Sequence, residues 1–333
     1  MYDLIIVGGG PGGVAAGVYA ARKKIKTLLI TDSFGGQSLV SADVQNWIGT
    51  KSVSGFELGK MLEEHLRAQE DIETIDDDLV IKVEKTDSGP PYSGEALASL
   101  DASRSGRPQP NMSNVGGFRL ETQNGKNFET KYILLASGSR RRKLGVPGER
   151  ELDGRGVAYC STCDAPIFKN KTVAVVGGGN AGLESVIDLL PYASKIYLII
   201  RSDSMKGDPI TQDKIKASEK VEIIYGALTQ EILGDKFVTG LRYKNAKSDE
   251  IKELKLDGVF VEIGLVPNSE FVKNLVNVNQ VGEVIVDHKT QATSAAGIWA
   301  VGDVSDVLYK QNNVSAGDAV KAVLSIYERV KKH

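Results

Sequence analysis

Residues 2–13 read YDLIIVGGGPGG, an apolar run that leads directly into a cluster of glycines. Gly8, Gly10 and Gly13 fit the G-x-G-x-x-G pattern of a dinucleotide-binding turn. The first glycine permits a tight turn, the second lets the backbone approach a pyrophosphate, and the third allows a helix to pack closely on a strand. The helix that follows offers its N-terminal amide groups to phosphate charge. We therefore expect a strand, a glycine turn and a helix over residues 2–22.

A second strand is expected over residues 26–31, and it ends at Asp32, 19 residues beyond Gly13. In dinucleotide folds an acidic residue about 20 residues after the glycine turn accepts a hydrogen bond from a ribose hydroxyl. Asp32 is the candidate for that role.

The same pattern recurs in mid-chain, where residues 171–182 read KTVAVVGGGNAG. Gly177, Gly179 and Gly182 occupy the three glycine positions, and a helix and a further strand are expected after them. A single glycine pattern is a weak signal, and the alternative is a pair of glycine-rich turns that bind nothing. Two copies in the same context predict an α/β protein with two Rossmann-like, three-layer dinucleotide-binding domains. A flavin and a nicotinamide are the economical pair of ligands, because one can pass a hydride to the other.

The nicotinamide preference depends on the end of the strand at residues 195–200. An NAD site would place an acidic residue there, but this chain has Ile200 followed by Arg201. An arginine suits a 2′-phosphate, and Lys206 could assist it. The sequence thus favours NADPH and leaves NADH possible; the alternative is that both cations are exposed loop residues.

Two cysteines, Cys160 and Cys163, stand just ahead of the second glycine turn in the segment CSTCD. A structural zinc site needs four ligands, and the chain offers no further cysteine and only three scattered histidines. An accidental pair of buried thiols is the second alternative. We interpret the pair as a redox dithiol, because two intervening residues permit a disulfide within one turn. Asp164 could protonate a leaving thiolate or, equally well, cap the helix that begins there.

Composition narrows the classes of partner. The net charge of −2 creates no field for nucleic acid or an anionic membrane, and no apolar run approaches the roughly 20 residues that cross a bilayer. Two cysteines exclude a secreted disulfide framework, and no signal peptide is recognised at residues 1–7. We expect a cytoplasmic protein that does not bind nucleic acid or a membrane.

Taken together, the motifs resemble the low-molecular-weight thioredoxin reductases and the flavoprotein portion of the F component of alkyl hydroperoxide reductase. The resemblance runs from residue 1 to about 330 and rests on nine motifs in order: Gly8–Gly13, Gly35–Gln37, Gln45–Trp47, Ala136–Gly138, Cys160–Asp164, Gly177–Gly182, Gly264–Asn268, Val301–Asp303 and Tyr309–Gln311.

This resemblance implies a pyridine nucleotide-disulfide oxidoreductase of the class II type. Residues 1–143 and 268–333 would form a discontinuous FAD domain, and residues 144–267 an inserted NAD(P)H domain. The cofactor-binding residues it implies are Gly8, Gly10, Pro11, Gly13, Asp32, Gly36, Gln37, Asn46, Val83, Ala136, Gly138, Gly177, Gly179, Asn180, Gly182, Arg201, Lys206, Gly302, Asp303, Lys310 and Gln311.

It also implies a mechanism, in which reduced nicotinamide passes hydride to the flavin and the flavin reduces the Cys160–Cys163 disulfide. Cys163 would be the sulfur nearer the flavin, and Asp164 the acid. Cys160 would then attack the disulfide of thioredoxin or a similar small redox protein. The family implies a homodimer whose domains rotate between two states.

The chain departs from the family pattern in two places. Residues from about 86 to 116 read as a flexible insertion between two strands. The 2′-phosphate motif is half kept, since the family's His-Arg-Arg and later Arg read here as Ile200, Arg201, Ser202 and Lys206. Three alternatives follow: an NADH- or ferredoxin-dependent disulfide reductase, a reductase of a peroxiredoxin system, and a flavin-binding redox sensor.

Overall fold

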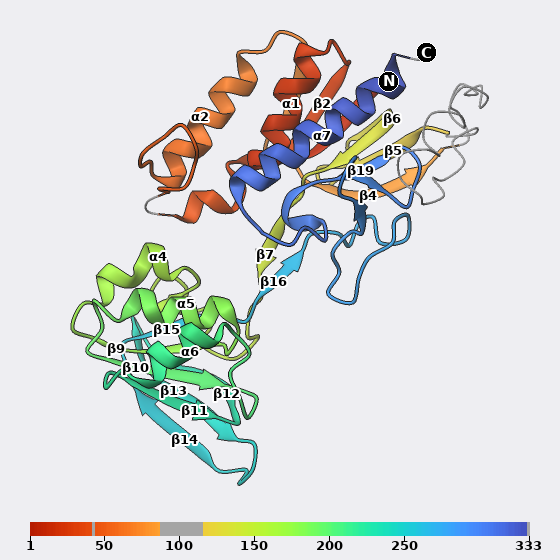
Figure 1. Ribbon diagram of the computed structural model, residues 1–333. Helices are drawn as coiled ribbons and strands as arrows, with labels where there is room; N and C mark the ends of the chain where they lie inside the picture. Colours follow the sequence, from red (N-terminus) through yellow and green to blue (C-terminus); the bar gives the residue numbers. More distant parts are fainter. Residues whose placement is uncertain (42–43, 87–115, 332–333) are drawn as a thin grey trace. The chain divides into compact units, whose positions relative to one another are not determined.

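The computed structural model describes residues 1–41, 44–86 and 116–331, with the side chains of residues 40, 162 and 163 excepted. It divides into two compact units (Figure 1). Unit 1 comprises residues 1–39, 44–140 and 267–333, and unit 2 comprises residues 40–43 and 141–266. The predicted insertion falls largely on residues 87–115, outside the described residues.

Unit 1 is organised around a sheet in the order β17-β18-β19-β6-β1-β2-β3. The central strands β1 (Tyr2–Gly9), β2 (Thr27–Phe34), β3 (Ile72–Ile75), β6 (Asn127–Leu135) and β19 (Ile298–Ala300) pair in parallel. The remaining strands are β4 (Val80–Lys85), β5 (Phe118–Thr122), β17 (Val286–Asp287) and β18 (Ala292–Thr293). Its helices are α1 (Pro11–Arg22), η1 (Gly36–Val40), α2 (Gly55–Arg67), η4 (Gly302–Val304) and α7 (Asn312–Val330).

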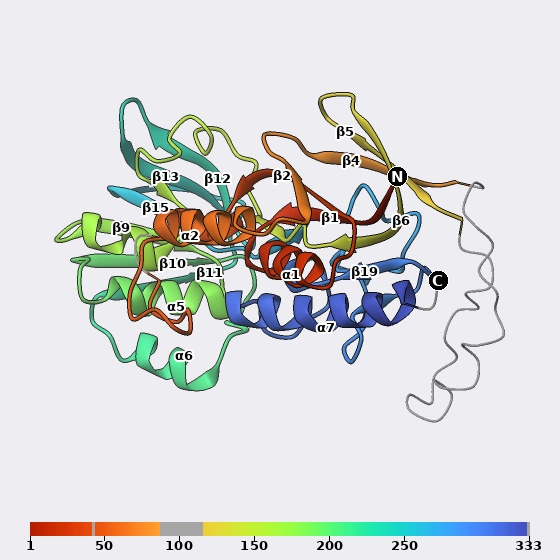
Figure 2. The same cartoon turned by 90° about the horizontal axis from the view of Figure 1, so that it is seen from above.

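Strand β1 shows why unit 1 has three layers. Side chains alternate between the two faces of a strand, so a strand buried on both faces feeds two cores. Leu4 and Ile6 pack with α1, α2 and α7, whereas Ile5 and Val7 pack with β4 and β5 on the other side. The result is a layer of helices, a parallel sheet and an antiparallel layer, with α1 and α7 side by side (Figure 2).

Unit 2 repeats this construction. Its five parallel strands run in the order β11-β10-β9-β15-β8, with Val173 and Val175 facing the helices and Ala174 and Val176 facing the antiparallel strands. The parallel strands are β8 (Val157–Ala158), β9 (Thr172–Val176), β10 (Lys195–Ile200), β11 (Val221–Tyr225) and β15 (Gly258–Val261). The other elements are α4 (Ser161–Asp164), η3 (Ala165–Phe168), α5 (Asn180–Leu189), α6 (Pro209–Lys216), β12 (Ala227–Gly234), β13 (Val238–Asn245) and β14 (Ile251–Lys255).

The crossings at the two ends of residues 141–266 pair as a ribbon of β7 (Ser139–Arg141) and β16 (Leu265–Pro267). The guanidinium of Arg140 donates to Asn268 Oδ1 at 2.8 Å and to Glu270 Oε1 at 2.6 Å, both in unit 1. The guanidinium of Arg141 instead donates to Glu262 Oε2 at 3.1 Å in unit 2. Two neighbouring side chains are therefore anchored to different units.

No helix in the described part of the chain is both long and apolar enough to cross a bilayer.

Candidate functional site

The first glycine turn has a geometry that only glycine allows. Gly8 has a φ of +110°, and a Cβ there would lie 2.3 Å from the carbonyl oxygen of Ala136. A Cβ at Gly13 would lie 1.8 Å from the carbonyl oxygen of Gly8, because the start of α1 packs directly on the end of β1. Pro11 opens the helix, and Gly10 precedes it without a side-chain cap. The first amide groups of α1 are thus left to an external acceptor.

Two predicted polar residues, Gln37 and Asp303, and one unexpected residue, Ser139, converge near this turn. The Gln37 amide donates to Ser139 Oγ at 2.9 Å and to Asp303 Oδ2 at 3.5 Å, and the Ser139 hydroxyl donates to the same Asp303 oxygen at 3.3 Å. Gly36, with a φ of +55°, lies against Gly10: a Cβ on Gly36 would be 3.3 Å from its Cα. Ser139 was missed because no motif marks it, although it directly follows Ala136-Ser137-Gly138.

The second predicted group gathers at the start of α7. The Asn46 amide donates to Gln311 Oε1 at 3.2 Å, so two residues that are 265 positions apart are in contact. Asn313 fixes the same loop by donating to the Asn46 carbonyl at 2.6 Å and accepting from the Ile48 amide at 3.3 Å. Sequence reasoning missed Asn313, whose helical position gave no signal.

Three further predicted cofactor-binding residues of unit 1 lie outside these two groups: Lys310, Asp32 and Val83. The Lys310 ammonium donates to the carbonyls of Asp303 and Ser305 and pairs with Glu283 at 2.8 Å, so it supports the turn that carries Asp303. Asp32 is exposed within β2, which continues to Phe34 and is therefore longer than the strand predicted to end at Asp32. The Val83 side chain is 6% exposed and packs in the core of unit 1, so a ligand would have to meet its backbone.

The second glycine turn reproduces the first within unit 2. A Cβ at Gly177 would lie 2.1 Å from the carbonyl oxygen of Glu262, and a Cβ at Gly182 would lie 2.2 Å from that of Gly177. Gly179, by contrast, faces open space and precedes α5 without a side-chain cap. The close approaches and the open middle position are those that a dinucleotide turn requires.

The loop at residues 201–208 is tied to this turn. The Lys206 amide donates to the Gly178 carbonyl at 2.7 Å, and the Asp208 amide donates to Asn180 Oδ1 at 2.7 Å. The predicted residue Asn180 therefore holds the loop, while the side chains of Arg201 and Lys206 are exposed. Lys247 reaches the same loop from the β13–β14 turn and pairs with Asp203 at 3.2 Å.

Cys160 directly precedes the short helix α4, and Asp164 is the last residue of that helix. Cys160 is disulfide-bonded, while the side chain of Cys163 lies outside the described residues. Asp164 is half-buried, and this burial raises the pKa of its carboxyl. It stands at the start of η3 but makes no side-chain cap there, so of its two predicted roles the structure gives no support to capping.

Two carboxylates contact this segment, the buried Glu149 and the half-buried Asp188, and the sequence had not singled them out. Glu149 accepts from the amides of Leu144 and Gly145 at 2.8 and 2.7 Å and from the Tyr159 hydroxyl at 3.0 Å. Burial, and then this contact, raise the pKa of Tyr159. Asp188 on α5 accepts from the Ser161 hydroxyl at 2.7 Å.

Glu262 is a further carboxyl near this segment, and its pKa is strongly shifted. It follows β15, is 7% exposed and pairs with Arg141. Burial raises its pKa to about 7; Arg141 opposes the shift, and the charges of Asp188 and Glu184 add to it. Its only sequence signal was a place at the predicted domain boundary.

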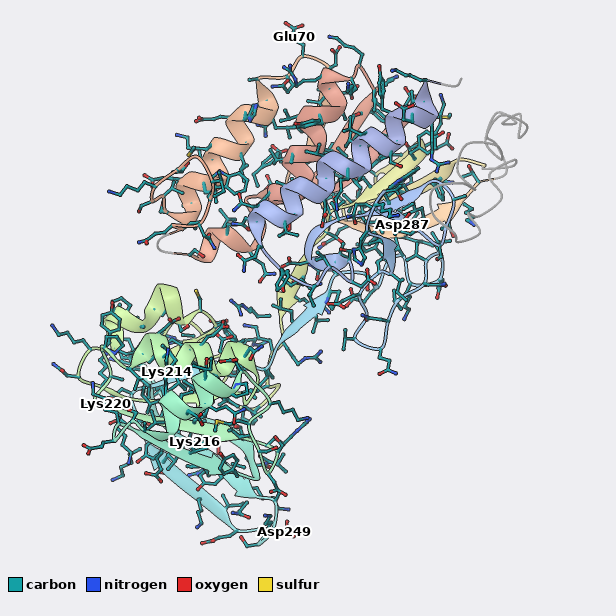
Figure 3. All side chains as sticks on the ribbon, viewed as in Figure 1. Glu70, Lys214, Lys216, Lys220, Asp249 and Asp287 are labelled. Carbon is teal, nitrogen blue, oxygen red and sulfur yellow. The ribbon has the colours of Figure 1, made fainter. Side chains whose placement is uncertain are left out.

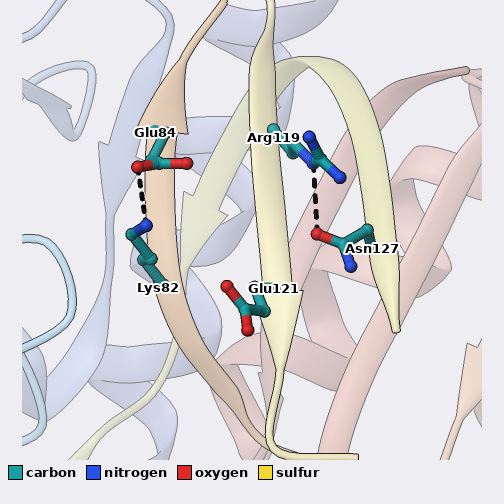
Figure 4. Close-up of a pocket in the computed structure, with 5 residues that line it drawn as sticks. All are labelled: Lys82, Glu84, Arg119, Glu121 and Asn127. Carbon is teal, nitrogen blue, oxygen red and sulfur yellow. Dashed lines mark hydrogen bonds and ion pairs between the residues drawn. The ribbon is translucent and has the colours of Figure 1, made fainter. Parts of the chain in front are cut away.

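A polar hollow on unit 1 contains none of the predicted residues. Lys82, Glu84, Arg119, Glu121 and Asn127 line it on the outer face of β4, β5 and β6 (Figure 4). Lys82 pairs with Glu84 at 2.7 Å, and Arg119 donates to Asn127 at 3.1 Å. Four of the five lining residues are thus paired with one another, and none of the five is a glycine of the kind that forms the two turns.

Comparison with known proteins agrees with this arrangement. A family model described as pyridine nucleotide-disulphide oxidoreductase matches residues 2–322. The F component of alkyl hydroperoxide reductase from Pseudomonas putida is 39% identical over 330 residues, which cover 99% of this chain and 58% of that protein. A protein named NADH dehydrogenase from Bacillus subtilis is 36% identical over 327 residues, covering 98% of this chain and 58% of that protein. This chain thus spans somewhat more than half the length of these relatives.

Among solved structures, thioredoxin reductase of Lactococcus lactis (FR conformation) matches with a TM-score of 0.75 and 30% identity, covering all of both chains. The fold class and the family resemblance predicted from the sequence are confirmed.

Proposed function

Because the chain belongs to the pyridine nucleotide-disulphide oxidoreductase family, we propose that it is an FAD-dependent thioredoxin-disulfide reductase. It would draw electrons from NADPH and deliver them, through FAD and the pair Cys160 and Cys163, to the disulfide of thioredoxin or a similar small redox protein. The observation that carries the proposal is the presence of two glycine turns with the same dinucleotide geometry, with the C-x-x-C pair placed beside the second.

Unit 1 fits FAD. The backbone around Gly10 has no side chain to obstruct a pyrophosphate, and α1 begins without a cap or an acidic residue in its first turn. Asp32 would accept from the ribose, Asp303 would hold the ribityl chain, and Asn46 and Gln311 would lie near the flavin ring. When bound, FAD would supply two-electron chemistry between a nicotinamide and a disulfide.

Unit 2 fits a nicotinamide dinucleotide. Gly179 leaves room for a pyrophosphate at the start of α5, and the loop tied to Asn180 presents Arg201 and Lys206. These two cations favour a 2′-phosphate and hence NADPH. NADH is the competing donor, since the Bacillus subtilis relative carries the name NADH dehydrogenase.

The chain's own residues then provide the thiol chemistry. The Cys160 thiolate would attack the partner's disulfide, and Asp164 would donate a proton to the leaving thiolate. Burial favours the protonated carboxyl of Asp164, as a proton donor near neutral pH requires. Ile167, 66% exposed just after the dithiol helix, offers apolar surface to a protein partner.

Anaerobic titration of the purified yellow protein with NADPH and with NADH, followed by absorbance, tests this proposal. We expect NADPH to bleach the flavin, to require more than two electrons per flavin because the cysteines also accept them, and to support thioredoxin-coupled disulfide reduction. If neither nucleotide bleaches the flavin, a nicotinamide is excluded as the electron donor. If reduced ferredoxin alone bleaches it, the protein is a ferredoxin-dependent reductase. Bleaching without rapid turnover would instead indicate a sensor.

A second candidate is a reductase of a peroxiredoxin system, and the observation that favours it is the similarity to the F component of alkyl hydroperoxide reductase. The same assay with an oxidised peroxiredoxin in place of thioredoxin distinguishes the two. A homodimer is proposed from the likeness to thioredoxin reductases, and light scattering would measure it.

A further inference from the structure

Ser161, the first of the two residues between the cysteines, is hydrogen-bonded to the neighbouring helix α5. The Ser161 hydroxyl donates to Asp188 Oδ2 at 2.7 Å, and Ser161 is 7% exposed. A hydroxyl bound to a carboxylate makes a charge-assisted hydrogen bond, which is stronger and more directional than a bond between neutral groups. The contact therefore fixes the first turn of α4 to α5.

Helix α5 connects two functional regions of unit 2. It begins directly after Gly179, at the second glycine turn, and carries Asp188 near its C-terminal end. The dithiol helix and the proposed nucleotide turn are thus attached to one helix. Glu184 lies one turn before Asp188, on the same face of α5.

The charge of Asp188 reaches beyond this hydrogen bond. It is one of the charges that raise the pKa of Glu262, together with Glu184, while the guanidinium of Arg141 acts in the opposite direction. Four charged groups therefore share this corner of unit 2, three of them acidic. A net negative environment disfavours a nearby thiolate and hence the reduced dithiol.

We infer that Asp188 is a positioning residue for the dithiol: it anchors α4 through Ser161, and its negative charge keeps the Cys160–Cys163 couple harder to reduce. This inference rests on the proposed function, because it assumes that the two cysteines form the redox couple. Asp188 itself exchanges no electrons.

Two variants separate anchoring from charge. Asp188→Asn removes the charge but retains an oxygen that accepts from Ser161, and Ser161→Ala removes the hydrogen bond but retains the charge. Ser161→Thr retains the hydroxyl and should rescue the alanine variant. Asp213→Asn, which neutralises an exposed aspartate on α6, is the matched control.

The flavoprotein is equilibrated anaerobically with reduced and oxidised dithiothreitol, and its thiols are then alkylated and counted by mass. In this exchange the enzyme disulfide gains two electrons and two protons to give two thiols, and dithiothreitol is oxidised to its cyclic disulfide. At about pH 9, where thiolates are populated, we expect Asp188→Asn to shift the equilibrium toward the reduced form about fivefold, or about 20 mV. Ser161→Ala should shift the equilibrium less but lower the turnover number with protein disulfide.

The inference is overturned if Asp188→Asn and Asp213→Asn give the same equilibrium, or if Ser161→Ala turns over like the unaltered protein. In either of these outcomes the Cys160–Cys163 pair is still reducible, so the proposed function is not contradicted. If dithiothreitol generates no thiols at these two positions in the unaltered protein, the proposed function fails as well, so the two failures are distinguishable.

Discussion

At the scale of single residues, burial raises the pKa of two carboxyls in unit 2, but their surroundings differ. Asp164 is half-buried beside the cysteine pair, and burial raises the pKa of its carboxyl. Glu262 is more deeply buried and has Arg141 as a partner, which only partly offsets the cost of removing its charge from water. Asp164 can therefore serve as an acid, whereas Glu262 carries a cost in stability.

That cost predicts a pH dependence. Because folding raises the pKa of Glu262 from 4.5 to about 7, the folded state binds a proton more tightly than the unfolded state. The stabilisation is fully present below pH 4.5 and is lost as the pH rises through about 7. Through Glu262, the free energy of unfolding of the unaltered protein should fall by on the order of 2 kcal/mol between pH 5 and 8. In Glu262→Gln this fall should be absent.

Urea unfolding at several pH values measures this effect, with the exposed Glu219→Gln as control. Equal slopes of stability against pH in the unaltered protein and in Glu262→Gln would contradict the prediction.

A glycine substitution tests the first dinucleotide turn. Gly13→Ala should abolish flavin retention, because its Cβ would lie 1.8 Å from the Gly8 carbonyl oxygen and would force α1 away from β1. Gly317→Ala is the matched control, since a Cβ there meets nothing within 4 Å. The ratio of flavin to protein absorbance after purification gives the result, and an equal ratio in both variants would count against a flavin at this turn.

At the scale of elements, short-range motifs were predicted well and long-range contacts were not. The glycine turns follow from local steric rules, so the pattern alone located β1, α1, β9 and α5. Ser139 and Asp188 acquire partners only when segments far apart in the sequence fold together, and the sequence around them has no repeating pattern. Asn180 is a further example. Its place in the glycine motif predicts a cofactor contact and gives no indication that its side chain accepts a hydrogen bond from the Asp208 amide, which holds the loop at residues 201–208.

That loop makes a prediction about nucleotide choice. Replacing both Arg201 and Lys206 with alanine should raise the KM for NADPH about tenfold or more and leave the KM for NADH nearly unchanged, because only NADPH carries the 2′-phosphate. Lys214→Ala, on the exposed face of α6 (Figure 3), provides the control. Equal changes for the two nucleotides would show that the cations do not bind that phosphate.

At the scale of the whole molecule, each unit has a core on both faces of its own parallel sheet. Unit 2 is built almost entirely from one continuous stretch, residues 141–266, whose ends are held together by the Arg142 amide donating to the Gly264 carbonyl at 2.9 Å. The crossings predicted from the sequence, at 143/144 and 267/268, lie in segments rich in glycine and proline, as domain boundaries often do.

This organisation predicts that residues 141–266, expressed alone, form a cooperatively folded protein that retains nucleotide binding and carries no flavin. Circular dichroism during thermal unfolding and a fluorescence titration with NADPH measure the two properties. A gradual, non-cooperative melt would mean that unit 2 depends on unit 1 for its fold.

The anchoring of Arg140 and Arg141 to different units has a mechanical consequence. Between these two clamps lies a single peptide bond, which is planar and resists twisting. Any torque between the units must therefore be absorbed by the φ and ψ angles on either side of that bond and by the paired strand β16. A rotation of one unit would then be confined to a few backbone angles, and loosening either arginine would lengthen the segment over which the twist is spread.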